Sequence, residues 1–194
     1  MNASPKGRLI VVSGPSGVGK SSIIDEVVDR TNSRFSVSGT TKSPRQGEVD
    51  GVDYHFVTNE AFLDAVDQGL MLEWAEYAGH LYGTPRSEVE PALADGINVI
   101  LNIEIEGAKQ IRRTHPDAVL IFISPPSLDE LAKRLAGRGD TAPDDLERRF
   151  SVAAREITEA PDVYDHIVQN DALDDAINEV LDILGEEGAG VAIQ

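Results

Sequence analysis

One stretch near the amino terminus constrains the fold of this chain more than any other. The apolar run Leu9–Val12 has the composition of a short buried strand. It is followed by the pattern of a phosphate-binding P-loop, which reads Gly14-Pro15-Ser16-Gly17-Val18-Gly19-Lys20-Ser21. The glycines leave backbone N–H groups open to a polyphosphate, Lys20 adds a positive charge, and Ser21 offers a hydroxyl to a magnesium ion. A helix after the loop would point its positive dipole end at the same anion. The stretch therefore predicts nucleotide binding rather than a plain glycine-rich turn.

Composition restricts the other functions that the chain can have. The sequence carries 34 acidic and 17 basic residues, a net charge of −17, which disfavours a surface that binds nucleic acid. There is no cysteine, so disulfides and thiolate zinc sites are excluded, and no apolar run is long enough for a membrane-spanning helix. The four histidines show no metal-ligand spacing. We expect a cytoplasmic protein with local positive clusters for anionic substrates.

Periodicity predicts an α/β fold, because strands and helices alternate at both ends of the chain. In strand 70–77, Leu72 and Trp74 should face the core and Glu73 the polar side. Thr58 and Ser87 should each cap the helix that follows, and Ser127 should open a capping box with Glu130. The tail from Gly185 should be frayed. The remaining expected strands are 35–38, 53–57, 81–84, 97–103, 118–124 and 166–168, and the expected helices are 20–30, 58–69, 87–96, 107–113, 127–135, 143–157 and 171–184.

The middle of the chain is predicted to be a strand-rich insertion folded on itself. Residues 37–96 would form this insertion, and residues 1–36 and 97–194 would form the core, a parallel sheet flanked by helices. One loop of the insertion, 40–48, is polar and carries two cations, Lys42 and Arg45.

The insertion also carries a family resemblance. The stretch VSGTTKSPRQGEVDGVDYHFV at 37–57 resembles the substrate-domain signature of guanylate kinases. Further blocks agree in order: Leu72–Glu76 with Tyr82-Gly83-Thr84, then 121–127, then 134–139. The resemblance runs from about residue 7 to 184.

The resemblance implies phosphoryl transfer from MgATP to GMP, giving ADP and GDP, with a P-loop core, a GMP-binding domain and a helical lid at about 137–149. It implies that ATP binds Gly14–Ser21 with Asn170 near the adenine, and that Ser21 binds Mg²⁺ together with the nucleotide phosphates. Lys20, Arg45, Arg138 and Arg149 would be catalytic. The implied GMP site comprises Ser38, Lys42, Arg45, Tyr54, Glu73, Tyr82, Thr84 and Glu104. The implied partners are small nucleotides, with no nucleic acid and no membrane, and the chain could be a monomer or a homo-oligomer.

Some positions depart from the family pattern. The family usually has arginine where Lys42 stands, and a lysine keeps the charge but not the planar fork. In the stretch 102–107, Asn102, Glu104 and Glu106 replace an acid, an aspartate and a glutamine. The resemblance places the acid at position 104 between the guanine, the metal and the phosphates, so the longer Glu104 would change the geometry there.

Two other functions fit parts of the pattern. A non-catalytic scaffold domain on the same fold would bind peptides, but such domains typically lose the P-loop lysine, and Lys20 is present. A kinase for a ribose bisphosphate would share the P-loop but not the guanine pocket, and Glu73, Tyr82 and Thr84 argue against it.

Overall fold

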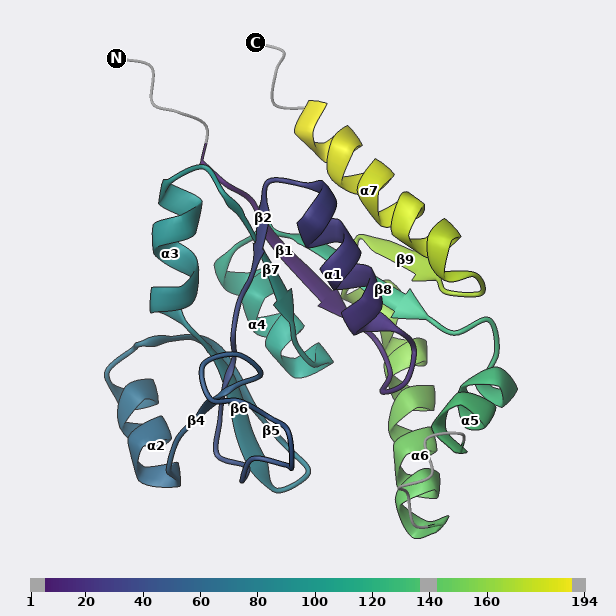
Figure 1. Cartoon of the computed structure of the whole chain (residues 1–194), viewed down its shortest axis with the longest axis horizontal. Coiled ribbons are helices and arrows are strands. Elements are labelled where there is room, and N and C mark those ends of the chain that lie inside the picture. Colours follow the sequence, from purple (N-terminus) through teal and green to yellow (C-terminus); the bar gives the residue numbers. More distant parts are fainter. Residues whose placement is uncertain (1–5, 137–142, 190–194) are drawn as a thin grey trace. The chain divides into compact units, whose positions relative to one another are not determined.

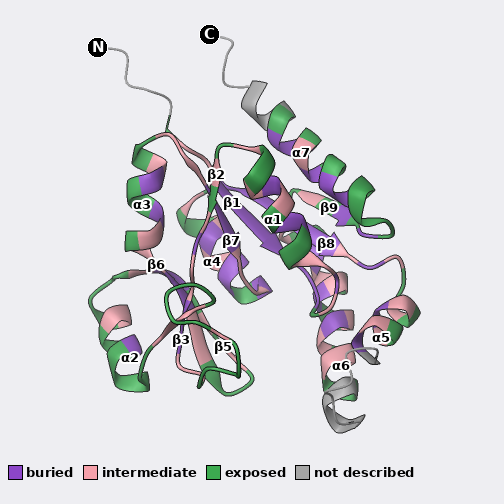
Figure 2. Ribbon diagram, viewed as in Figure 1, coloured by how far each residue is buried: buried purple, intermediate pink, exposed green. Residues whose placement is uncertain are grey.

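The computed structural model of the chain describes residues 6–136 and 143–189. Five strands form a parallel sheet in the order β2-β7-β1-β8-β9, flanked by helices, which confirms the expected fold class (Figure 1). β1 (Leu9–Ser13) is buried along its whole length (Figure 2). α1 (Lys20–Arg30) has the predicted bounds and buries Ile23, Ile24 and Val27, the apolar residues that recur at helical spacing.

The contacts divide the chain into two compact units. The first contains the chain up to Val11 together with Asn32–Val119, and the second contains Val12–Thr31 and the chain from Leu120 onward. In the first unit, β2 (Ser33–Phe35) pairs in parallel with β7 (Asn98–Asn102), and α3 (Arg86–Ala94) contacts β7.

A second, four-stranded sheet belongs to the first unit and has the order β4-β3-β6-β5. Its long strands are β5 (Met71–Tyr77) and β6 (His80–Pro85), which pair antiparallel, while β3 (Gly39–Thr40) and β4 (His55–Phe56) are short. α2 (Asn59–Asp67) begins after Thr58, whose hydroxyl accepts a hydrogen bond from the Ala61 amide, as the sequence predicts. α2 and α4 (Ile105–Thr114) both contact β5.

The second unit holds the P-loop and the carboxyl-terminal part of the chain. β8 (Val119–Ser124) and β9 (His166–Gln169) pair in parallel. α5 (Leu128–Ala136) and α6 (Pro143–Glu159) pack through buried Leu131, Leu135 and Ala153, and a short 3₁₀ turn, Ala160–Asp162, follows. The Ser127 hydroxyl accepts from the Glu130 amide and so caps α5, as predicted. Within the described ranges, no helix is long and apolar enough to cross a membrane.

Four local expectations are wrong. α3 begins at Arg86, so Ser87, the expected cap, lies in its first turn and Pro85 occupies the cap position. The strand expected at 35–38 ends at Phe35. α7 (Leu173–Ala189) continues past Gly185, where a tail was expected. In β5, a register irregularity between Met71 and Glu73 breaks the simple alternation of faces, and Glu73 is buried while Trp74 is exposed.

The turn between β5 and β6 is the one described position where a residue other than glycine adopts a positive φ. Ala78 has φ 52° and Gly79 has φ 78°, between the paired residues Tyr77 and His80. Two positive φ values in a two-residue turn define a type I′ hairpin, which favours Asn-Gly over Ala-Gly.

We predict that Ala78→Asn raises the free energy of unfolding by about 0.5–1 kcal/mol, since asparagine tolerates this conformation better than alanine. Ala78→Val should lower it, because a branched side chain is strained there. Urea denaturation followed by circular dichroism measures both. An Ala78→Asn protein less stable than the parent would contradict the turn assignment.

Candidate functional site

The P-loop joins β1 to α1 within the second unit. The Lys20 ammonium is folded over the loop and donates to the carbonyl oxygens of Gly14 at 2.5 Å and Pro15 at 3.1 Å. Charged oxygens are stronger acceptors than carbonyls, so an incoming phosphate can take over these bonds. Ser21 follows on the exposed first turn of α1. The loop thus places one cation and one hydroxyl at the start of a helix, where an anion is favoured.

Asn170 braces the P-loop from the end of β9. Its side-chain amide donates to the Val18 carbonyl at 2.7 Å, and its backbone N–H donates to the Ser124 carbonyl at 2.8 Å. Asn170 is 5% exposed. Gly19 has φ 100°, and a Cβ added there would lie 2.5 Å from the Asn170 amide nitrogen. Glycine is therefore required at position 19 for two reasons: its φ is positive, and a side chain would collide with the Asn170 amide.

The brace was not visible in the sequence. Asn170 was expected beside an adenine, whereas the contact that the structure gives its side chain is to the P-loop backbone. Arg134, which the predicted site does not include, donates to the Asn170 carbonyl at 3.2 Å. Of the two arginines expected to act from a lid, Arg149 lies half-buried on α6, and Arg138 lies outside the described residues.

In the first unit, the β5–β6 hairpin brings Glu73 and Thr84 together. The two residues are directly opposite in the ladder, and the Thr84 hydroxyl donates to Glu73 Oε1 at 2.7 Å. Their exposed fractions are 4% and 0%. Burial raises the pKa of Glu73 from 4.5 to about 7, against the opposing effect of the Thr84 hydrogen bonds. A buried carboxylate of this kind is an acceptor that gains from donors brought by a ligand.

Helix α4 covers this carboxylate. A Cβ added at Gly107 would collide with Glu73 Oε2, so the absence of a side chain there permits the close approach. Glu104 precedes the helix at its cap position. Gly107 stands in the stretch 102–107 that departs from the family pattern. No local sequence pattern predicts its contact with Glu73, because the two residues lie far apart in the chain.

Two tyrosines lie near one another beside this pair. The rings of Tyr54 and Tyr82 meet edge to face with centroids 6.0 Å apart. Burial raises the pKa of both hydroxyls, so both remain protonated hydrogen-bond donors at neutral pH. Among the smaller effects on the pKa of both hydroxyls, the charge of Glu104 raises it and the charge of Arg45 lowers it.

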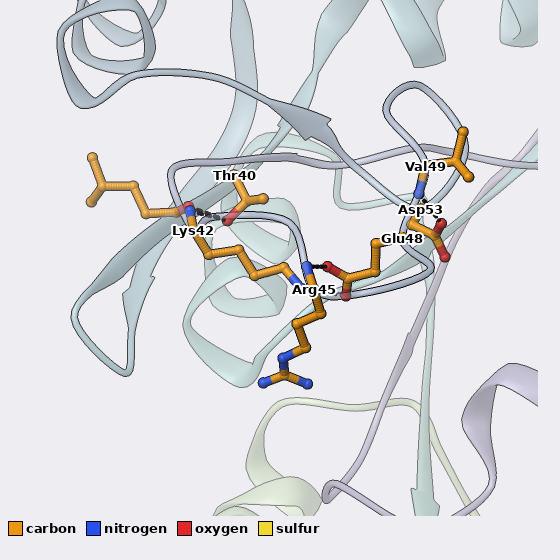
Figure 3. Close-up of polar contacts among 7 residues, drawn as sticks. Thr40, Lys42, Arg45, Glu48, Val49 and Asp53 are labelled. Atoms are coloured by element: carbon orange, nitrogen blue, oxygen red, sulfur yellow. Dashed lines mark hydrogen bonds and ion pairs between the residues drawn. The ribbon is translucent and has the colours of Figure 1, made fainter.

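The polar loop after β3 is organised by Glu48. One carboxylate oxygen accepts from the Lys42 ammonium at 2.5 Å, and the other accepts from the Arg45 backbone amide at 2.7 Å (Figure 3). These contacts hold the pKa of Glu48 below its usual range, the Arg45 amide contributing most. The Lys42 ammonium also lies 4.6 Å from the centroid of the Tyr54 ring.

The two cations of this loop, Lys42 and Arg45, therefore differ in exposure and in how their side chains are paired. The Lys42 side chain is only 10% exposed and is paired with Glu48. Arg45 is exposed, and its guanidinium points away from the Glu48 carboxylate (Figure 3). Ser38 is half-buried, and its carbonyl accepts from the His55 amide at 2.9 Å. The predicted GMP-site residues thus all belong to the first unit, and the P-loop residues with Asn170 to the second.

The raised pKa of Glu73 has a consequence for stability. Between pH 4.5 and about 7, the folded state binds a proton at Glu73 that the unfolded state has lost. The stability contributed by this group therefore falls as pH rises through that window. Glu73→Gln removes the titration but keeps an oxygen for the Thr84 hydroxyl. We predict that the variant gains stability over the parent as pH rises to about 7, by up to about 3 kcal/mol, and no further above it.

Urea unfolding at a series of pH values measures this difference. Glu76→Gln is the matched control, because Glu76 lies exposed on the same strand. A Glu73→Gln difference that is flat with pH would show that Glu73 titrates normally.

Comparison with known proteins identifies the family of this chain. The sequence matches the guanylate kinase family over residues 6–187. A guanylate kinase of Thermus thermophilus is 49% identical over 182 residues, covering 94% of this chain and 82% of the relative. One of Synechocystis is 46% identical over 185 residues, covering 95% and 96%. The solved guanylate kinase of Anaplasma phagocytophilum has a TM-score of 0.79 at 32% identity, over 95% of this chain and 87% of that one. The chain belongs to the guanylate kinase family.

Proposed function

We propose that the protein transfers the terminal phosphoryl group of ATP to GMP, giving ADP and GDP. The observation that carries this proposal is the buried Glu73 carboxylate, which accepts a hydrogen bond from Thr84 and has a raised pKa. Guanine presents two adjacent donors, N1–H and the N2 amino group, and an ionised carboxylate can accept from both. Adenine presents a lone pair at N1 and would leave the carboxylate unpaired.

The phosphate of GMP requires donors that converge on an anion. Arg45 supplies an exposed guanidinium, and the protonated hydroxyls of Tyr54 and Tyr82 supply two neutral donors. Lys42 adds positive charge beside them but shares it with Glu48. In this proposal Glu48 keeps Lys42 and the Arg45 backbone in place, and Arg45 makes the main charged contact with the phosphate.

The phosphates of ATP would occupy the P-loop, with Lys20 leaving the Gly14 and Pro15 carbonyls to bind them. The exposed Ser21 hydroxyl suits the hard, oxygen-preferring Mg²⁺, which would neutralise charge between the phosphates. Phosphoryl transfer needs positioning and charge stabilisation more than a protein nucleophile. We assign that stabilisation to Lys20, Arg45, Arg138 and Arg149.

The proposed domains divide the chain according to the nucleotide that each part would bind. The four-stranded sheet and its loops, within 37–96, would bind GMP, with Ser38 at its start and Glu104 contributed from outside it. Residues 1–36 and 97–194 would bind ATP, with a lid at about 137–149. We further propose that the protein acts in the cytoplasm on small nucleotides rather than on nucleic acid, consistent with its net charge of −17.

The first experiment is a coupled ADP-release assay with GMP, IMP, AMP, CMP and UMP. We predict that GMP is used far better than the others, and that Glu73→Ala loses GMP turnover by about 10²-fold or more while ATP still binds. Glu76→Ala on the same strand is the control and should retain activity. If Glu73→Ala phosphorylates GMP as well as the parent, guanine is recognised elsewhere; if the parent prefers another nucleotide, the proposed substrate is wrong.

A second prediction concerns the P-loop brace. Asn170→Asp keeps the size of the side chain but cannot donate to the Val18 carbonyl, and it brings a negative charge close to the phosphate loop. The KM for ATP should rise about tenfold or more, while the KM for GMP stays within about twofold. Asn178→Asp, on an exposed position of α7, is the control. An unchanged KM for ATP would mean that the P-loop does not need the brace.

A further inference from the structure

Gln110, on α4, makes an unusual contact with strand β5. Its side-chain amide nitrogen donates to the Trp74 carbonyl at 2.6 Å, and its amide oxygen accepts from the Trp74 N–H at 3.3 Å. A primary amide offers the same donor and acceptor as a peptide group, so this pair of bonds reproduces one rung of a β-ladder. β5 is the edge strand of its sheet, and Trp74 would otherwise expose both backbone groups there.

The Gln110 contact lies at the part of β5 where the pairing with β6 is irregular. The β5–β6 pairing is irregular between Met71 and Glu73, immediately before Trp74. At such an irregularity the ladder is locally disrupted and the strand bends, and a shift of one residue turns a side chain to the opposite face. Gln110 fixes the strand from its other side, at the residue next to Glu73.

Gly107 lies one helical turn before Gln110 and faces the same strand. Gly107 abuts the Glu73 carboxylate and Gln110 binds the Trp74 backbone, so α4 contacts two successive residues of β5. Thr84 holds the carboxylate from the β6 side. The carboxylate is therefore bounded by β6 and by α4, and its placement against α4 depends on the Gln110 contact.

We propose that Gln110 is a positioning residue for base recognition, which sets the Glu73 carboxylate where it can accept from both N1–H and the N2 amino group of a guanine. This inference rests on the proposed function. Two adjacent donors must meet two lone pairs in one plane, so a small rotation of β5 loses one of the bonds. Inosine monophosphate has N1–H but no N2 amino group, and its recognition depends less on that alignment.

The test compares Gln110→Met, which keeps the length of the side chain but has no amide, with the parent. The KM for GMP should rise about tenfold, whereas the KM for IMP should change by less than about threefold and the KM for ATP by less than about twofold. Preference for GMP over IMP, measured as the ratio of kcat/KM values, should therefore fall. Lys109→Met, at the preceding position of the same helix, should leave the ratio unchanged.

Gln110→Glu is the second variant. It can still accept from the Trp74 N–H but cannot donate to the Trp74 carbonyl, the shorter of the two bonds, so it should lose the same preference. If both variants keep the GMP-to-IMP ratio of the parent, or weaken both substrates equally, Gln110 is no more than structural and the inference is overturned. A parent protein that does not phosphorylate GMP would instead overturn the proposed function.

Discussion

A carboxylate removed from water is the constraint on which the rest of the first unit depends. Glu73 exposes only 4% of its surface, and burial raises the pKa of its acid to about 7. Burying a charge without a partner is costly, so a ligand that brings hydrogen-bond donors to Glu73 would offset that cost. Thr84 supplies one bond from the neighbouring strand, and Gly107 lets a helix close over the group. Such a site rejects ligands that lack the matching donors.

The positive groups proposed to bind phosphate are arranged differently: in both units, neutral or acidic neighbours hold them in place. Backbone carbonyls hold Lys20 in the P-loop, and Glu48 holds Lys42 and the backbone of Arg45 in the first unit. Preorganised charges stabilise a transferring phosphoryl group without moving during the reaction. In this acidic chain, two of the cations proposed to bind phosphate, Lys20 and Arg45, therefore lie in or next to short loops.

The sequence predicted the elements whose signals are local. The P-loop, the bounds of α1, and the caps at Thr58 and Ser127 all depend on residues close together in the chain. The structure adds what depends on distant residues. Gln110 meets Trp74 across 36 positions and Asn170 meets Val18 across 152, and neither contact leaves a periodic pattern. The burial of Glu73 was missed because the irregular pairing in β5 breaks the alternation from which faces are predicted. Arg138 lies outside the described residues.

The central claim is that an ionised Glu73 receives the base of GMP, and calorimetric proton counting tests it most directly. Titrating GMP into the protein at pH 7, in buffers of different ionisation enthalpy, gives the protons released on binding. A carboxylate with a pKa of about 7 is half protonated there, so binding should expel about half a proton from Glu73. Glu73→Gln receives the same ligand, so protons lost by the phosphate cancel in the comparison. We expect greater proton release by the parent than by Glu73→Gln; equal release by both would show that Glu73 does not receive the base as an ionised carboxylate.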